Sequence, residues 1–98
     1  MSSVFEALSH PTRRAILELL KDGSKTAGEL ADAFDVSKAT MSGHFSKLKA
    51  AGLVHSDQIG TSVVYSVNMS VLEEALQSFM SRVGLGRKSE SQTGEMSS

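Results

Sequence analysis

The sequence predicts a mainly α fold with a small β-hairpin, an α+β arrangement within one small domain. Two observations support this fold class. Apolar residues recur at helical spacing in four segments before Gly52 and again in one segment after residue 67. Between them, two runs rich in β-branched residues flank Gly60. The expected order is therefore four helices, two strands and a fifth helix. The 98 residues and their 40% hydrophobic content are enough for one core.

The first three helices have local start and stop signals. The apolar residues of "VFEAL" predict a short N-terminal helix. "HPTRRAILELLKDG" predicts a second, because Pro11 suits a first helical turn and Gly23 suits a stop. "TAGELADAF" predicts a third, because Thr26 and Glu29 have the spacing of a capping box.

The fourth helix follows the third after a very short connection. Only two residues separate Phe34 from Ser37, which is a good helix N-cap. The helix is expected to run to Ala51 and to stop at Gly52. Two helices joined this tightly, the second of them capped, indicate a helix-turn-helix.

The remaining segments complete a winged helix-turn-helix. "LVHSDQI" and "TSVVYSV", on either side of Gly60, predict the hairpin. "NMSVLEEALQSFMSRVG" predicts the last helix, with Ser70 as its cap. The glycine- and serine-rich segment 84–98 is expected to be disordered. Residues 1–83 would form the folded domain.

The fourth helix has two contrasting sides. Met41, Phe45 and Leu48 point toward the core, whereas the opposite side carries small residues, hydroxyls and lysines. No acid occurs between Asp35 and Asp57. A slender, acid-free helix suits a DNA major groove, and lysines suit phosphates. The predicted DNA-binding residues are Ser37 as the cap, then Lys38, Ala39, Thr40, Ser42, Gly43, Ser46 and Lys47, with Gln58, Thr61 and Ser62 on the hairpin.

Other interpretations stay open at this stage. Small residues on a helix can also pack closely against another helix. Arg13 and Arg14 could contact phosphate or form a surface pair with Glu6 or Glu18. The net charge of −1 and a hairpin tip without a base leave room for a winged helix used as a protein-interaction module.

Several function classes find no support in the sequence. The chain has no cysteine, which excludes disulfides and thiolate chemistry. His10, His44 and His55 are too scattered to form a ligand pair, so we expect no metal and no other cofactor, with His44 a hydrogen-bonded structural residue. The sequence has neither a glycine-rich phosphate loop nor a recognisable pair of catalytic carboxylates, so no motif in it indicates an enzyme. Without a signal peptide or a run long enough to span a bilayer, a cytoplasmic protein is expected.

Residues 4–83 resemble the ArsR/SmtB family of bacterial transcriptional repressors. The resemblance is carried by "HPTRRAILELLKDG", by "TAGELADAFDVSKATMSGHFSKLKAAGLV" and by "GTSVVYSVN". It is strongest to compact autorepressors of that family, which lack the usual metal-site residues. It implies a homodimer that binds an imperfect inverted repeat in double-stranded operator DNA. The family's metal sites have no counterpart, since Ala31 and Ala33 stand in the helix that can carry cysteines and the last helix has no histidine.

The resemblance also implies that the terminal helices form the dimer interface. The apolar stripes of these two helices agree with this, because they offer more apolar surface than one small core needs. The predicted interface residues are Val4, Phe5, Leu8, Leu72, Leu76, Phe79, Met80 and Val83. The operator sequence, the regulated genes and any effector stay open.

Overall fold

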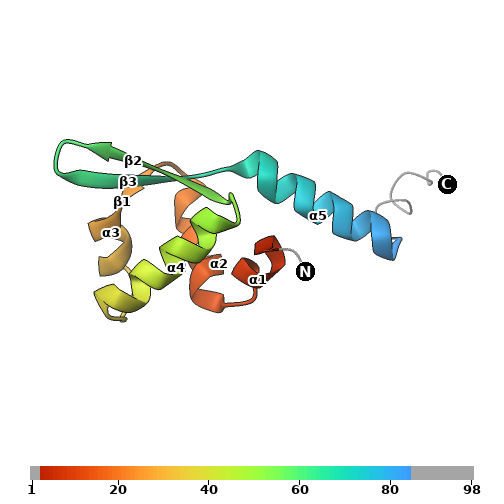
Figure 1. Ribbon diagram of the computed structural model, residues 1–98, viewed down its shortest axis with the longest axis horizontal. Coiled ribbons are helices and arrows are strands. Elements are labelled where there is room, and N and C mark those ends of the chain that lie inside the picture. Colours follow the sequence, from red (N-terminus) through yellow and green to blue (C-terminus); the bar gives the residue numbers. More distant parts are fainter. Residues whose placement is uncertain (1–2, 85–98) are drawn as a thin grey trace.

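The computed structural model describes residues 3–84 and has the predicted order of elements with one addition (Figure 1). The elements are α1 (Ser3–Leu8), α2 (Pro11–Leu20), β1 (Lys25–Thr26), α3 (Ala27–Asp32), α4 (Lys38–Ala50), β2 (Val54–Ile59), β3 (Ser62–Val67) and α5 (Met69–Val83). The winged helix-turn-helix is therefore confirmed. Apart from Gly84, the segment predicted to be disordered lies outside the described residues.

The addition is β1, which makes the sheet three-stranded. All strands are antiparallel, in the order β1-β3-β2. Lys25 lies opposite Tyr65, and Thr26 lies opposite Val64. A two-residue strand has no alternation that a sequence pattern could reveal. The hairpin turns at Gly60, whose φ of 61° favours a residue without a side chain.

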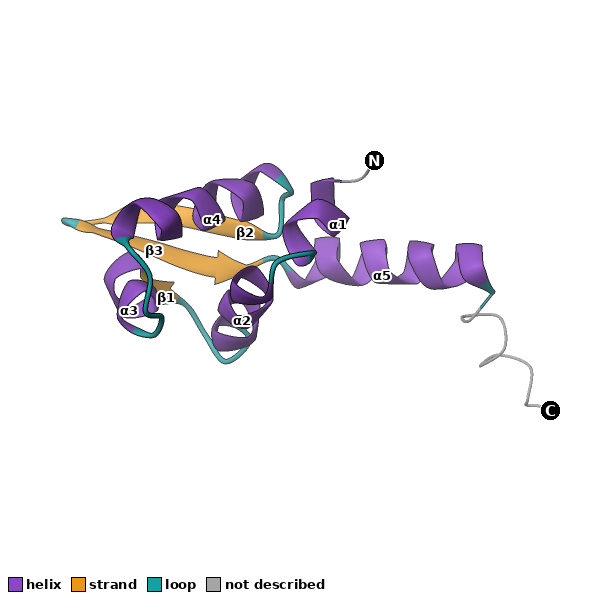
Figure 2. Cartoon of the chain, turned by 90° about the horizontal axis from the view of Figure 1, so that it is seen from below, coloured by secondary structure: helices purple, strands orange, loops and turns teal. Residues whose placement is uncertain are grey.

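The core lies between helices α1–α4 and the sheet. Ile16, Leu30, Leu48 and Leu53 are completely buried. The Phe45 ring on α4 stacks on Tyr65 of β3 with 4.4 Å between ring centroids. This contact holds α4 against β3, and Figure 2 shows α4 lying along the sheet.

The helix caps are mostly those predicted. Thr26 Oγ1 accepts from Glu29 N at 3.0 Å while Glu29 Oε1 accepts from Thr26 N at 2.9 Å, which confirms the capping box. The predicted cap of α5 was wrong. Asn68, not Ser70, is the last extended residue, and its Oδ1 accepts from Val71 N at 3.4 Å. Ser70 already lies in the first turn of α5.

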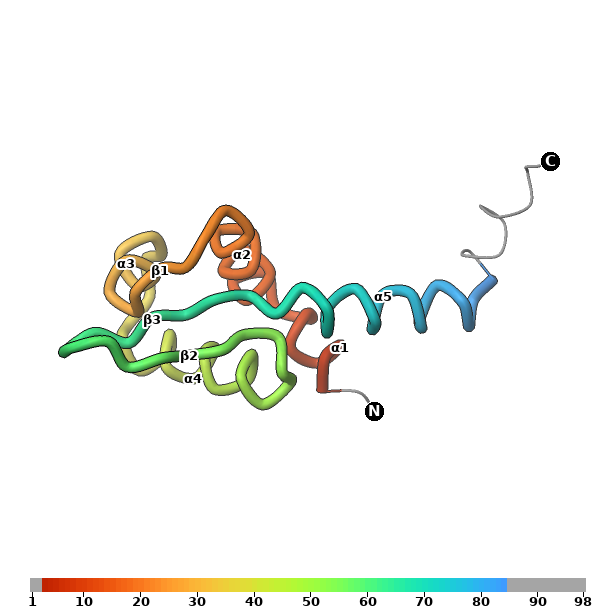
Figure 3. The backbone as a smooth tube through the Cα atoms, turned by 90° about the horizontal axis from the view of Figure 1, so that it is seen from above, coloured from red at the N-terminus to blue at the C-terminus, as the bar shows by residue number. Residues whose placement is uncertain are grey.

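Helix α5 projects away from the other elements (Figures 1 and 3), and the molecule as a whole, with α5 included, is elongated, with extents of 54 × 25 × 21 Å. It has no buried residue. Its stripe residues Leu76, Phe79, Met80 and Val83 are between 38% and 54% exposed. Phe79 contacts Phe5 of α1, with 5.4 Å between ring centroids. No helix within residues 3–84 is long and apolar enough to cross a membrane.

Candidate nucleic-acid interface

Helix α4 separates into a buried side and an exposed side, as its sequence predicted. Met41, Phe45 and Leu48 are 1%, 8% and 0% exposed. The predicted DNA-facing residues are all exposed; they are Lys38, Ala39, Thr40, Ser42, Gly43, Ser46 and Lys47. A side chain added at Gly43 would meet no atom within 4 Å, so this point of the helix is open to close approach.

The start of α4 is fixed by its cap. Ser37 Oγ accepts from Thr40 N at 3.1 Å and donates to Thr40 Oγ1 at 3.0 Å. These bonds hold the Thr40 hydroxyl at the end of the helix that has free backbone donors and a favourable dipole for anions. They leave the Thr40 hydroxyl proton available to a further acceptor.

The hairpin tip presents polar groups and one apolar side chain. Gln58, Thr61 and Ser62 are exposed, as predicted. Gln58 Nε2 donates to Gly60 O at 3.1 Å, so this amide already stabilises the turn. Ile59 is 61% exposed, a feature that the β-branched pattern of the strand did not indicate.

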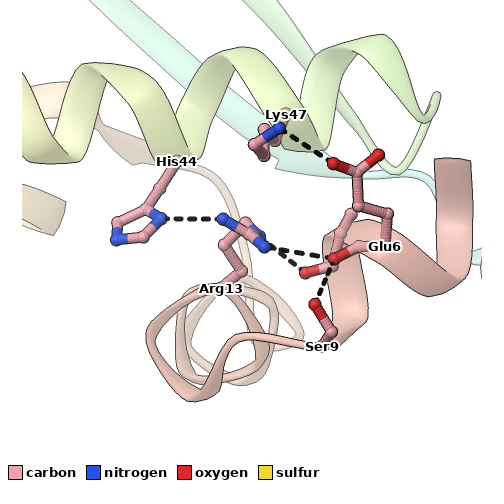
Figure 4. Close-up of polar contacts among 6 residues, drawn as sticks. Glu6, Ser9, Arg13, His44 and Lys47 are labelled. Atoms are coloured by element: carbon pink, nitrogen blue, oxygen red, sulfur yellow. Dashed lines mark hydrogen bonds and ion pairs between the residues drawn. The ribbon is translucent and has the colours of Figure 1, made fainter.

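The lysines of α4 differ in their surroundings. Lys47 Nζ forms an ion pair with Glu6 Oε2 of α1 at 3.0 Å, and both side chains are more than half exposed (Figure 4). The hydrogen bond and positive charge of Lys47 lower the pKa of Glu6. Within residues 3–84, Lys38 and Lys49 have no carboxylate in ion-pair range. They are therefore the unshared positive charges of α4.

Arg13 is neither the surface residue nor the phosphate contact that the sequence suggested as alternatives, because its side chain is buried, whereas Arg14 is exposed. Arg13 is 7% exposed, and its Nε donates to Ala7 O at 2.7 Å while Nη2 donates to Glu6 O at 3.1 Å. Arg14 Nη1 donates to Leu8 O at 2.6 Å. The helical partner of Ala7 O would be the N–H of residue 11, which is Pro11 and has none. The guanidinium groups therefore satisfy the last carbonyls of α1.

His44 is the third member of this buried cluster. Its Nδ1 lies 3.2 Å from Arg13 Nη1, and its side chain is 6% exposed (Figure 4). Because a guanidinium can only donate, His44 Nδ1 must accept, and the ring is neutral with its proton on Nε2. Burial, then the nearby His10 and Arg13, lower the pKa of His44. The predicted structural histidine is confirmed.

Within residues 3–84, no three His, Asp or Glu side chains lie close enough together to hold a metal ion. The rings of His10 and His44 are 4.5 Å apart, but His10 Nδ1 accepts from Thr12 N at 3.1 Å and caps α2. The nearby Arg13 would also repel a cation. These two imidazoles are engaged in the fold.

Comparisons with known proteins agree with this geometry. The helix-turn-helix domain family matches residues 8–57. The transcriptional repressor SdpR of Bacillus subtilis (strain 168) is 40% identical over 86 residues, which cover 88% of this chain and 96% of that protein. The arsenical resistance operon repressor of Staphylococcus aureus is 31% identical over 79% of this chain and 74% of its own length. The chain belongs to the ArsR/SmtB family of winged-helix transcriptional repressors.

A solved structure of the family extends the match to the fold. The ArsR-like transcriptional regulator from Rhodococcus sp. RHA1 is 32% identical, with a TM-score of 0.74 over 90% of this chain and 82% of that one. Proteins of the ArsR/SmtB family are regulators and not enzymes. This chain is accordingly a DNA-binding transcriptional regulator.

Proposed function

We propose that this ArsR/SmtB protein is a homodimeric repressor that binds an inverted-repeat operator, with its own promoter as the first site to test. The observation that carries the proposal is the exposed, slender and acid-free side of α4. Helix α4 itself carries no acid, and because Glu6 of α1 pairs with Lys47, Lys38 and Lys49 are the unshared cations that it offers to phosphates. The relative SdpR is a transcriptional repressor, and repression of its own gene is what the resemblance to compact autorepressors of the family implies.

Dimerisation is supported by apolar surface that the protomer leaves uncovered. Val4, Phe5, Leu8 and Leu72 are half-buried, whereas Leu76, Phe79, Met80 and Val83 are exposed on α5. A stripe of this kind along a projecting helix is typical of a protein interface. A two-fold axis beside α1 and α5 would bury both helices in a self-complementary contact. It would place two α4 helices about one DNA turn, roughly 34 Å, apart.

The proposed roles of the α4 residues follow from their positions. Lys38, Lys47 and Lys49 would contact phosphates, and Thr40, Ser42 and Ser46 would bond to base edges or phosphates. Gly43 and Ala39 would allow the helix backbone to come close to the groove floor. Gln58, Thr61 and Ser62 would add polar contacts from the hairpin. A bacterial operator lies in the cytoplasm, where we expect the protein to act.

The test is a fluorescence-anisotropy titration of promoter DNA and scrambled DNA at two salt concentrations. We expect tight promoter binding by two protomers and weaker, salt-sensitive binding to scrambled DNA. Lys38→Gln should weaken binding to both DNAs and reduce the slope of log affinity against log salt by about one. Lys21→Gln is the matched control, because Lys21 is an exposed lysine at the end of α2. Equal effects of the two variants would contradict the assignment of α4.

Substitution of the α4 hydroxyl residues tests whether the protein recognises the base sequence of its operator. Thr40→Val and Ser42→Ala should change the preference for promoter over scrambled DNA more than the affinity for scrambled DNA. Equal losses on both DNAs would make these residues phosphate contacts. Charge reversal at Lys47 would also weaken all DNA binding, but it would place a carboxylate beside Glu6, so Lys47→Gln is the cleaner change.

A protein-interaction module is the second candidate function. The 61% exposed Ile59 at the hairpin tip is the observation that favours it, because apolar groups at a tip suit a protein partner better than DNA. Failure to bind either DNA at low salt would support this candidate. Loss of promoter binding by Ile59→Ser would instead place the tip at the DNA.

A further inference from the structure

A pocket of about 360 Å³ lies where α3, α4 and β3 meet, beside the base of the hairpin. This volume is within the range of roughly 300–1,000 Å³ that small-molecule sites occupy. Its walls are mostly apolar. The residues that decide its chemistry are Ala31 from α3, Lys38, Met41, Ser42 and Phe45 from α4, and Tyr65 from β3.

Tyr65 is a buried polar group without a partner. Its side chain is 8% exposed, and its hydroxyl has no hydrogen bond within residues 3–84. A buried phenol hydroxyl is normally bonded, because an unmade bond costs the desolvation of the group. The ring is held by the stack on Phe45, so Tyr65 cannot turn away freely. Because Tyr65 also lines the pocket, its hydroxyl is the donor that a ligand there would satisfy.

The other polar groups of the pocket point to an acidic ligand. Lys38 and Ser42 also line the pocket, and no Asp or Glu does. Together with Tyr65, these residues bring an ammonium group and two hydroxyls to an otherwise apolar lining, which matches a molecule with one anionic group and a compact hydrocarbon part. We propose that this pocket binds a small apolar monocarboxylate, with its hydrocarbon against Ala31 and Phe45 and its carboxylate toward Tyr65, Ser42 and Lys38.

Occupation of the pocket would affect DNA binding. Lys38 and Ser42 line the pocket and also belong to the proposed DNA-facing residues. A carboxylate bonded to them would remove one positive charge and one hydroxyl from that surface. The ligand and the operator therefore compete. This second step rests on the proposed function, whereas binding of the acid does not.

The first experiment uses the DNA-free protein. The chain has one tyrosine and no tryptophan, so tyrosine fluorescence reports on Tyr65 alone. The probes are cyclohexanecarboxylate and its uncharged match cyclohexanecarboxamide, neither of which absorbs with tyrosine. We expect the carboxylate to change the tyrosine fluorescence saturably, with a Kd of about 1 mM or lower. The amide should bind at least tenfold more weakly. No saturable change up to about 10 mM carboxylate, or equal binding of both probes, would overturn the proposal.

Substitutions of residues that line the pocket separate their contributions to carboxylate binding. Backbone amide NMR shifts replace fluorescence as the readout, since Tyr65→Phe removes the fluorophore's hydroxyl while keeping the ring stack. Tyr65→Phe and Lys38→Gln should each weaken the carboxylate at least fivefold and leave the amide unchanged. Gly28→Leu should fill the pocket in a folded protein, because a Cβ at Gly28 meets only Thr26 Oγ1, at 3.9 Å. Unchanged carboxylate affinity in all three would overturn the assignment.

Operator titrations with and without cyclohexanecarboxylate test the competition. We expect saturating acid to lower operator affinity at least fivefold in the natural protein and to have no effect on Gly28→Leu. Acid binding with unchanged operator affinity would overturn the competition. A protein that binds no operator would contradict the proposed function, while the tyrosine titration still decides whether the pocket is a ligand site.

Discussion

The buried guanidinium of Arg13 gives the sharpest prediction about stability. Arg13→Met keeps most of the side-chain volume but removes all three hydrogen bonds. Glu6 O keeps two other donors, Ser9 N at 3.2 Å and Ser9 Oγ at 2.7 Å. Ala7 O and His44 Nδ1 are left without a donor within residues 3–84. The unsatisfied acceptors therefore number two.

Each buried acceptor without a partner costs about 1–3 kcal/mol, and water can reach part of this cluster beside the exposed Glu6. We therefore expect Arg13→Met to lower the free energy of unfolding by about 2–4 kcal/mol. For a domain of this size, the melting temperature would fall by more than about 8 °C. The assay is thermal and urea unfolding followed by circular dichroism, at a fixed protomer concentration.

Arg14→Met is the matched control. Arg14 makes one exposed bond, to Leu8 O, which water can replace, so its loss should cost no more than about 1 kcal/mol. The two variants remove the same charge from neighbouring positions. Equal destabilisation by both would refute the view that burial of the Arg13 bonds, rather than helix charge, holds α1 in place.

Three further predictions follow from particular side chains. The pKa of His44 is lowered by burial, so on acidification below the ordinary histidine value of about 6.5 the unfolded chain binds a proton first and stability falls. In His44→Gln, whose amide oxygen can still accept from Arg13, the melting temperatures at pH 7.5 and 5.5 should therefore lie closer together. An unchanged pH dependence would show that His44 is not the source of the acid sensitivity. Gly43→Ala should raise stability by up to about 1 kcal/mol, because its methyl group meets nothing, yet weaken operator binding in anisotropy titrations by thickening α4; unweakened binding would mean that Gly43 does not face the groove. Phe79→Glu should convert the proposed dimer to monomers in sedimentation equilibrium, whereas the exposed neighbour Gln77→Glu should not, and a dimeric Phe79→Glu would exclude the α5 stripe as the interface.

The elements with local signals were predictable from the sequence. Ser37 and Thr26 act on backbone groups three residues away, so their caps depend on neighbours in the chain. The same is true of the two sides of α4, which depend only on helical periodicity. Exposure of the candidate DNA-facing residues could therefore be read correctly, although exposure does not by itself assign their contacts.

Features that depend on distant segments were missed. β1 exists because Lys25 and Thr26 pair with β3, far along the chain. Arg13 looked like a surface residue because its partners come from α1 and α4, and no pattern within α2 reveals them. The pairing of Lys47 with Glu6 is of the same kind. Burial of charge becomes visible only when three helices are assembled.

These distant contacts connect the proposed dimer surface to the proposed DNA surface. Helix α1 packs on α5 through Phe5 and Phe79, and it is held to α4 through Arg13, His44 and the ion pair of Lys47. In a two-fold dimer built on α1 and α5, the position of α1 would therefore set the distance between the two α4 helices. That distance must match the half-site spacing of the operator. A change that loosens α1 and leaves the exposed side of α4 unaltered, such as Arg13→Met, should then reduce discrimination between operators of different spacing more than it reduces affinity for a single half-site.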